Sequence, residues 1–157
     1  MDRRVRLQSG RISSWIASAL AVAALAIAPS VAAGRAPLAL GQVTTRLDRD
    51  SDALRSAFRS AVERELAGID LSNVKPSDRY VLSAALVKMD TRADGERTET
   101  TCVVSAMLTR ERGGALHAII RGRARAEDSP SEARSVELSA MRAAVHSALI
   151  RVPEALR

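Results

Sequence analysis

Three arginines occupy alternate positions in the C-terminal third of the chain, namely Arg121, Arg123 and Arg125. Because side chains of a strand alternate between its two faces, this spacing places them on one face, about 7 Å apart. Such a row concentrates positive potential and could bind an anionic envelope polymer, lipid head groups or an acidic protein. His117 has the same parity, so these four residues are the candidate ligand-binding set.

A solubilising role is the alternative for this row. Charged faces of sheets are common and protect strands from pairing with other chains. Two further arginines, Arg97 and Arg110, could lie near the row and strengthen its potential. The sequence leaves both roles open.

Residues for metal or catalytic chemistry are sparse. The two histidines, His117 and His146, fall on a predicted strand and a predicted helix without the spacing of metal ligands. Acidic residues gather near positions 90–99, but the calcium-binding loop pattern is absent. No nucleophile-elbow or phosphate-loop motif is present. We therefore predict no metal site, no cofactor and no assigned catalytic residue.

The single cysteine, Cys102, cannot form a disulfide within the chain. It lies on the apolar parity of a predicted strand, and unpaired cysteines are among the most buried residues. We expect a buried thiol, with a reactive or intermolecular thiol as the alternative.

Three consecutive strands would position these residues. Residues 115–126 alternate apolar side chains with arginines, and residues 101–109 alternate in the same way. Residues 79–90 are apolar on both parities, as in strands covered on both faces. The pattern therefore predicts a half-buried sheet whose arginines face water.

The turn between the last two strands is constrained by the apolar pattern. A two-residue loop at Gly113 and Gly114 would pair apolar residues of one strand with arginines of the next. This follows because a shift of one residue in the register moves every side chain to the other face of the sheet. A three-residue loop over residues 112–114 sets Leu108 against Ala118 and keeps the two parities in agreement. We predict that loop, with a positive φ at Gly114.

Two amphipathic helices flank the strands. Apolar residues recur at helical spacing over residues 51–67, after the possible caps Asp50 and Ser51 and before Gly68. A second stripe follows Ser129, whose spacing from Glu132 is that of a capping box, and ends at Pro153. Residues 42–47 could add an edge strand.

The predicted fold is an α+β two-layer sandwich with two helices on one face of an antiparallel sheet. The sheet has three strands, or four if residues 42–47 are included. This layout resembles small helix-on-sheet domains of envelope lipoproteins that serve outer-membrane secretion or activate cell-wall synthases, although no motif residue assigns a family. We divide the chain into an extended leader at 34–45, one domain at 46–153 and a tail at 154–157.

The first 33 residues have the layout of a secretory signal peptide. Four arginines precede an uncharged run from residue 12 to residue 33, which is rich in alanine and leucine. Small residues follow, so we predict cleavage between Ala33 and Gly34, with cleavage after Ala32 as the near alternative, and a periplasmic or extracellular protein. An uncleaved run could instead tether the chain, since it is just long enough to span a bilayer.

Cleavage would also change the composition. The segment carries four arginines and one aspartate, so its removal lowers the formal charge from +6 to +3. The same cut removes Trp15, which leaves Phe58 and Tyr80 as the aromatic residues. A weak positive charge and few stacking platforms argue against nucleic acid as a partner.

The sequence thus favours an exported, non-enzymatic binding or assembly module of unknown ligand. The alternatives are a small exported enzyme with a dispersed site and an envelope protein tethered by its N-terminal segment.

The intact mass of the protein recovered from the envelope fraction tests the predicted cleavage. We expect the mass of residues 34–157 and almost no tryptophan fluorescence, because Trp15 is the only tryptophan. The mass of the whole chain would contradict the prediction and favour the tether.

Overall fold

The computed structural model describes residues 37–48, 51–75 and 77–157, and these described residues belong to one compact unit. The predicted signal peptide and its cleavage site between Ala33 and Gly34 lie outside the described residues. The elements are β1 (Leu38–Thr45), α1 (Asp52–Ala67), β2 (Tyr80–Asp94), β3 (Arg97–Arg110), β4 (Leu116–Asp128), a 3-10 turn η1 (Pro130–Glu132), α2 (Ala133–Leu149) and α3 (Val152–Ala155).

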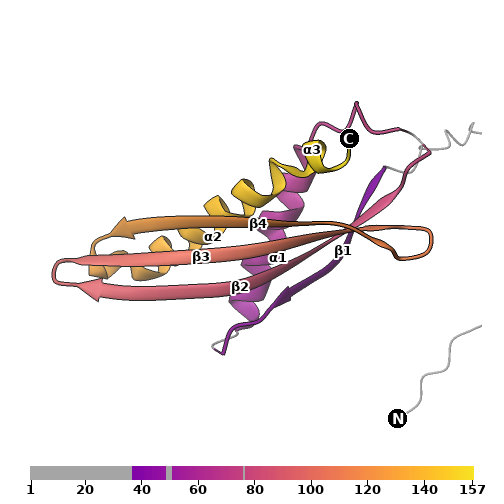
Figure 1. Ribbon diagram of the computed structural model, residues 1–157. Coiled ribbons are helices and arrows are strands. Elements are labelled where there is room, and N and C mark those ends of the chain that lie inside the picture. The colour runs from indigo at the N-terminus through magenta and orange to yellow at the C-terminus, as the bar shows by residue number, and fades with distance from the viewer. Residues whose placement is uncertain (1–36, 49–50, 76) are drawn as a thin grey trace, which may run out of the picture. The chain divides into compact units, whose positions relative to one another are not determined.

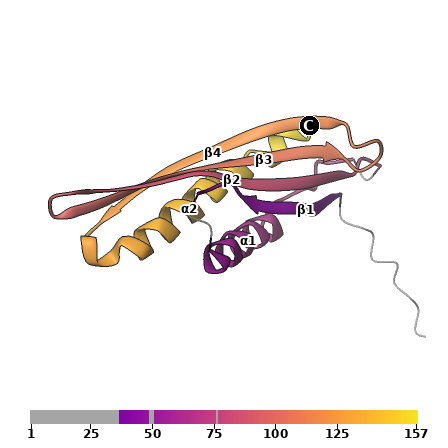
Figure 2. The same ribbon diagram turned by 90° about the horizontal axis from the view of Figure 1, so that it is seen from below.

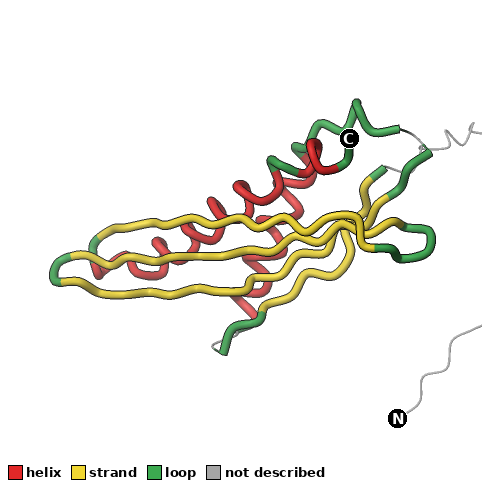
Figure 3. The backbone as a smooth tube through the Cα atoms, viewed as in Figure 1, coloured by secondary structure: helices red, strands yellow, loops and turns green. Residues whose placement is uncertain are grey.

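The four strands form one sheet in the order β1-β2-β3-β4 (Figures 1 and 3). The strands β2, β3 and β4 are antiparallel neighbours, whereas β1 runs parallel to β2. Both long helices lie on the same side of this sheet (Figure 2). The predicted α+β two-layer fold is therefore confirmed, with a mixed sheet.

The fourth strand differs from its prediction in position and direction. It begins at Leu38, inside the stretch interpreted as an extended leader, and Leu38 pairs with Tyr80. Its parallel pairing follows from α1, which connects β1 to β2, because parallel neighbours require a crossover connection. The sequence pattern carried no information on this direction.

Local sequence sets the start of α1 as predicted. The side chain of Ser51 accepts a hydrogen bond from the backbone N–H of Leu54 at 3.2 Å and so caps the first turn. The helix buries Phe58, Ala61 and Val62 and ends before Gly68.

The start of α2 differs from the predicted capping box. Ser129 makes no side-chain cap bond, and its hydroxyl lies 2.9 Å from that of Ser131. The chain instead enters through the 3-10 turn η1, whose first residue is Pro130. At the other end, α3 continues beyond Pro153 to Ala155, and the next residue, Leu156, is buried, so residues interpreted as a tail contribute to the core.

The helix and sheet layers approach each other closely at Gly122 of β4. A Cβ atom placed there would lie 2.6 Å from the backbone nitrogen of Ala148 and would also overlap the carbonyl oxygen of Ala144. Glycine in a strand often marks such a contact. The small residues of α2 and this glycine together allow the helix backbone to rest on the strand.

The β3–β4 hairpin has the predicted register but a longer loop. Leu108 pairs with Ala118, as expected, and Gly114 has a φ of 63°. However, the backbone N–H of Arg110 donates to the carbonyl of Ala115 at 2.9 Å, so four residues rather than three form the loop. A one-residue bulge at His117 absorbs the additional residue and restores the pairing.

A second bulge lies in β2. Leu86 pairs with Val104 and Lys88 pairs with Val103, which leaves Val87 as the additional residue. Before it, Leu82 and Leu86 face the helices; after it, Met89 does so. This change of parity explains why β2 looked apolar on both faces in the sequence.

Cys102 is fully buried in the core, so the predicted buried thiol is confirmed. Burial raises the pKa of its thiol to about 12. The thiol therefore stays protonated at neutral pH, and the thiolate is the form that attacks disulfides and alkylating agents.

Gly122→Ala tests the helix–sheet contact. We expect the free energy of unfolding to fall by about 1–3 kcal/mol, because overpacking forces the backbones apart, and denaturant titration measures it. Gly68→Ala is the matched control: its Cβ would lie no closer than 3.6 Å to its neighbours, at a φ of −91°. Equal stability of Gly122→Ala and the wild type would contradict the contact.

The reactivity of Cys102 tests its burial. In the native protein at pH 8 we expect no reaction with Ellman's reagent, and full reaction after denaturation in guanidinium chloride. Ser105→Cys, three residues along the same strand and partly exposed, should add one reactive thiol. Rapid labelling of native Cys102 would show that this part of the core opens readily.

Candidate binding face of the sheet

The side of the sheet opposite α1 and α2, named here the outer face, is left uncovered by the helices (Figure 2). The strand register arranges its side chains in rows across β2, β3 and β4. One row joins Ser83, Met107 and Ile119, and the next joins Ala85, Ser105 and Arg121. Two further rows join Lys88, Val103 and Arg123, and Asp90, Thr101 and Arg125. The face therefore changes from apolar to charged along the strands.

The apolar end lies next to the β3–β4 loop. Met107 is 40% exposed and Ile119 is 56% exposed, and Leu116 follows on the same edge. Contiguous exposed apolar side chains beside charged ones are typical of interaction surfaces. The adjacent row contains the small residues Ala85 and Ser105, which keeps the middle of the face flat.

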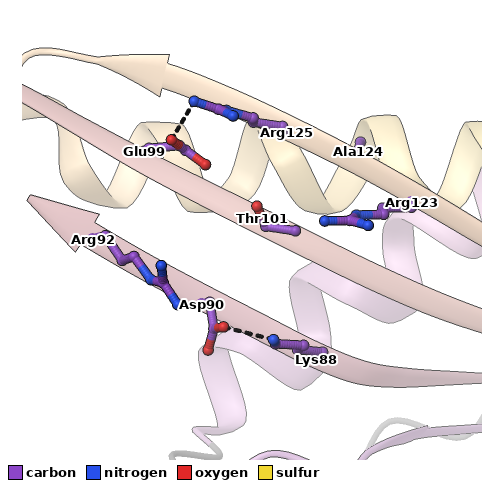
Figure 4. A pocket seen from close by; sticks show the side chains of 8 residues that line it. All are labelled: Lys88, Asp90, Arg92, Glu99, Thr101, Arg123, Ala124 and Arg125. Atoms are coloured by element: carbon purple, nitrogen blue, oxygen red, sulfur yellow. Dashed lines mark ion pairs between the residues drawn. The ribbon is translucent and has the colours of Figure 1, made fainter.

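The charged end contains a shallow hollow of about 510 Å³ (Figure 4). Three strands supply its lining: Lys88, Asp90 and Arg92 from β2; Glu99 and Thr101 from β3; and Arg123, Ala124 and Arg125 from β4. Four cationic side chains thus surround two carboxylates. The excess of positive charge favours an anion in the hollow.

Ion pairs neutralise part of this charge. Lys88 Nζ lies 2.8 Å from Asp90 Oδ2, and Arg125 pairs with Glu99 on the neighbouring strand. A hydrogen bond from Lys88, with the nearby charge of Arg92, lowers the pKa of Asp90 and keeps this carboxylate ionised. Both carboxylates of the hollow are therefore engaged.

The three arginines of the predicted row, Arg121, Arg123 and Arg125, differ in their ion pairing. All three lie on the outer face, but only Arg125 forms an ion pair within residues 37–48, 51–75 and 77–157. In that part of the chain, Arg121 and Arg123 have no carboxylate partner. They are the two members of the row that remain available to an external anion.

The two more distant arginines do not join the row. Arg97 NH1 lies 2.7 Å from Glu127 Oε1, so its charge is balanced. Arg110 pairs with Tyr80 in the register and has the parity of the helix-facing side.

His117 lies on the other side of the sheet from the arginines, contrary to the predicted outer position. Its ring centroid is 4.9 Å from that of the buried Tyr80. Its Nε2 lies 2.8 Å from the carbonyl oxygen of Ala155, which only accepts, so this nitrogen donates. The bulge at His117 reverses the parity, and the structure does not bring the residue together with Arg121, Arg123 and Arg125.

Sequence reasoning did not identify Lys88 or Arg92 as parts of this face. In a regular strand Lys88 and Arg92 would share the parity of Leu86, which faces the helices. The bulge at Val87 moves both to the outer face. The signal was present in the sequence as the two adjacent apolar residues Leu86 and Val87, followed by Met89.

A second hollow, of about 330 Å³, lies between the C-terminal ends of α1 and α2. There His146 Nδ1 is 2.9 Å from Glu65 Oε2, a pair that links the two helices. A histidine–carboxylate pair can act as a general base when it also contacts a nucleophile. Among the described residues, no hydroxyl or thiol forms a hydrogen bond with His146.

Within the described residues, no group of three or more potential metal-ligating side chains is present. No helix in the same ranges is long and apolar enough to cross a membrane.

Comparison with known proteins identifies the fold but no family. No protein-family model and no curated protein sequence matches the chain. The fold is similar to that of PelC from Paraburkholderia phytofirmans, which was crystallised as a dodecamer: the TM-score is 0.50 and the identity 16%, over 76% of this chain and 86% of that one.

Two lipoprotein structures have weaker likenesses. A candidate lipoprotein from Caulobacter crescentus gives a TM-score of 0.47 at 15% identity, over 78% of this chain and 89% of that one. A minor lipoprotein from Acinetobacter baumannii gives 0.35 at 15% identity, over 76% and 92%.

Proposed function

We propose that this protein is an exported, non-enzymatic binding or assembly module that binds an anionic partner through the outer face. Export is supported by the N-terminal sequence, in which basic, apolar and small residues follow one another as in a signal peptide. The proposed location is the periplasm or the extracellular space.

The uncovered outer face is the observation that carries the proposal. Arg121 and Arg123 have no carboxylate partner among the described residues, and the adjacent Ile119 is more than half exposed. An anionic partner with some apolar surface would satisfy both features at once. Burying that apolar surface would also lower the local dielectric and strengthen the charge pairing.

A similar structure supports the assembly role, because PelC, at a TM-score of 0.50, was crystallised as a dodecamer. The single cysteine of this chain is part of the core, so Cys102 is not the site of a lipid anchor. We infer the envelope location without that mode of attachment.

Reversing the charge of the row tests the proposal. At low salt, the double variant Arg121→Glu/Arg123→Glu of residues 34–157 should bind isolated envelopes of the source organism at least about tenfold more weakly than the wild type. Co-sedimentation over a range of protein concentrations measures the affinity. Added salt should weaken wild-type binding, because exposed charge pairs are screened.

The matched control is Arg134→Glu/Arg142→Glu, which makes the same charge change at two exposed positions of α2. This control should bind like the wild type. Equal loss in both double variants would show a dependence on net charge alone. Undiminished binding of the outer-face variant would reject this face as the binding surface.

A further inference from the structure

We propose that the hollow formed by Arg92, Thr101 and Arg123 is a binding site for a phosphate group carried by an envelope polymer or a lipid. This inference rests on the proposed function, since it places the recognised anion at one position of the outer face. It adds Arg92 and Thr101 to the residues that contact the partner.

The three side chains come from three neighbouring strands. Thr101 of β3 lies between Asp90 of β2 and Arg125 of β4 in the register. Arg92 and Arg123 stand one same-face position to either side of that row. In Figure 4, Arg123 extends from β4 toward Thr101 on β3, and Arg92 points back along β2 toward Asp90. Both guanidinium groups therefore point into the hollow from opposite ends.

The site contains hydrogen-bond donors that the described part of the protein leaves available for a ligand. Among the described residues, Arg123 has no carboxylate partner and the Thr101 hydroxyl forms no hydrogen bond. The Asp90 carboxylate lies in the same hollow, but Lys88 is its hydrogen-bonded partner at 2.8 Å. Glu99 is likewise occupied by Arg125. The carboxylates can remain paired while Arg92 and Arg123 accept an anion between them.

The arrangement of donors favours a tetrahedral anion. A carboxylate presents two oxygens in one plane and is matched by a single guanidinium fork. Here two guanidinium groups and one hydroxyl approach from three strands, so their donors can reach three different oxygens. A phosphate offers oxygens in these separate directions and carries enough negative charge to satisfy both arginines.

The site is open on the solvent side, which suits a phosphate attached to a larger molecule. The hollow is lined by strands from below, and the helices lie on the far side of the sheet. A polymer could continue from the phosphate over the flat row of Ala85 and Ser105 toward Arg121. A lipid headgroup would instead bring the whole outer face against a bilayer.

Chemical-shift titration of residues 34–157 with inorganic phosphate tests the site. We expect saturable shifts of backbone amides centred on positions 92, 101 and 123. Arg92→Gln and Arg123→Gln should each raise the dissociation constant for phosphate about tenfold, as expected for the loss of a hydrogen bond to a charged group. Thr101→Val, which keeps the shape of the side chain, should raise it severalfold.

Arg97→Gln is the matched control, because Arg97 lies on the same face outside the hollow and pairs with Glu127. It should leave phosphate binding unchanged. Shifts that spread over all arginines or never saturate would overturn the site. Succinate binding as tightly as phosphate would overturn the assignment of a tetrahedral anion.

Two arms distinguish the source of the phosphate. Soluble poly(glycerol phosphate) should bind more tightly than inorganic phosphate if a polymer is the ligand. If a lipid is the ligand, the protein should bind phosphatidylglycerol vesicles and should not bind phosphatidylcholine vesicles. Absence of binding to both the polymer and the phosphatidylglycerol vesicles would overturn the proposal. Envelope binding that depends on Arg121 but survives Arg92→Gln would reject the hollow alone and leave the proposed function intact.

Discussion

The contact between Gly122 and the backbone of α2 determines which side of the sheet is available for binding. Because β4 has no side chain at this point, Ala144 and Ala148 can bring the helix directly onto the strand. Both long helices then cover one face, and the apolar parities of β3 and β4 are buried there. The opposite face is left with the arginines, small polar residues and a few exposed apolar side chains.

Two bulges decide which individual residues reach that face. At His117 the bulge moves the imidazole to the helix side, where it packs on Tyr80 and donates to the carbonyl of Ala155. At Val87 the bulge has the opposite effect on a charged segment, since it moves Lys88 and Arg92 outward while Met89 enters the core. Bulges commonly redirect side chains near functional sites.

The sequence was sufficient for the fold class, the β3–β4 register and the placement of Arg121, Arg123 and Arg125, because strict alternation encodes which face each residue occupies. It was insufficient where alternation breaks. His117 and Arg92 were assigned to the wrong faces or overlooked, since one inserted residue reverses every assignment beyond it. The direction of β1 depends on the path of α1, which no local pattern encodes.

The charged hollow depends on the same departure from regularity. Without the bulge at Val87, a regular strand would give Arg92 the parity of Leu86 and turn it toward the buried side of the sheet, where an unpaired guanidinium is costly. With it, Lys88 reaches Asp90 on the outer face, and Arg92 lies across the sheet from Arg123. A single bulge therefore both turns Met89 toward the core, against which it packs, and assembles a cationic surface. This coupling gives the outer face a more specific architecture than a solubilising row of arginines would require.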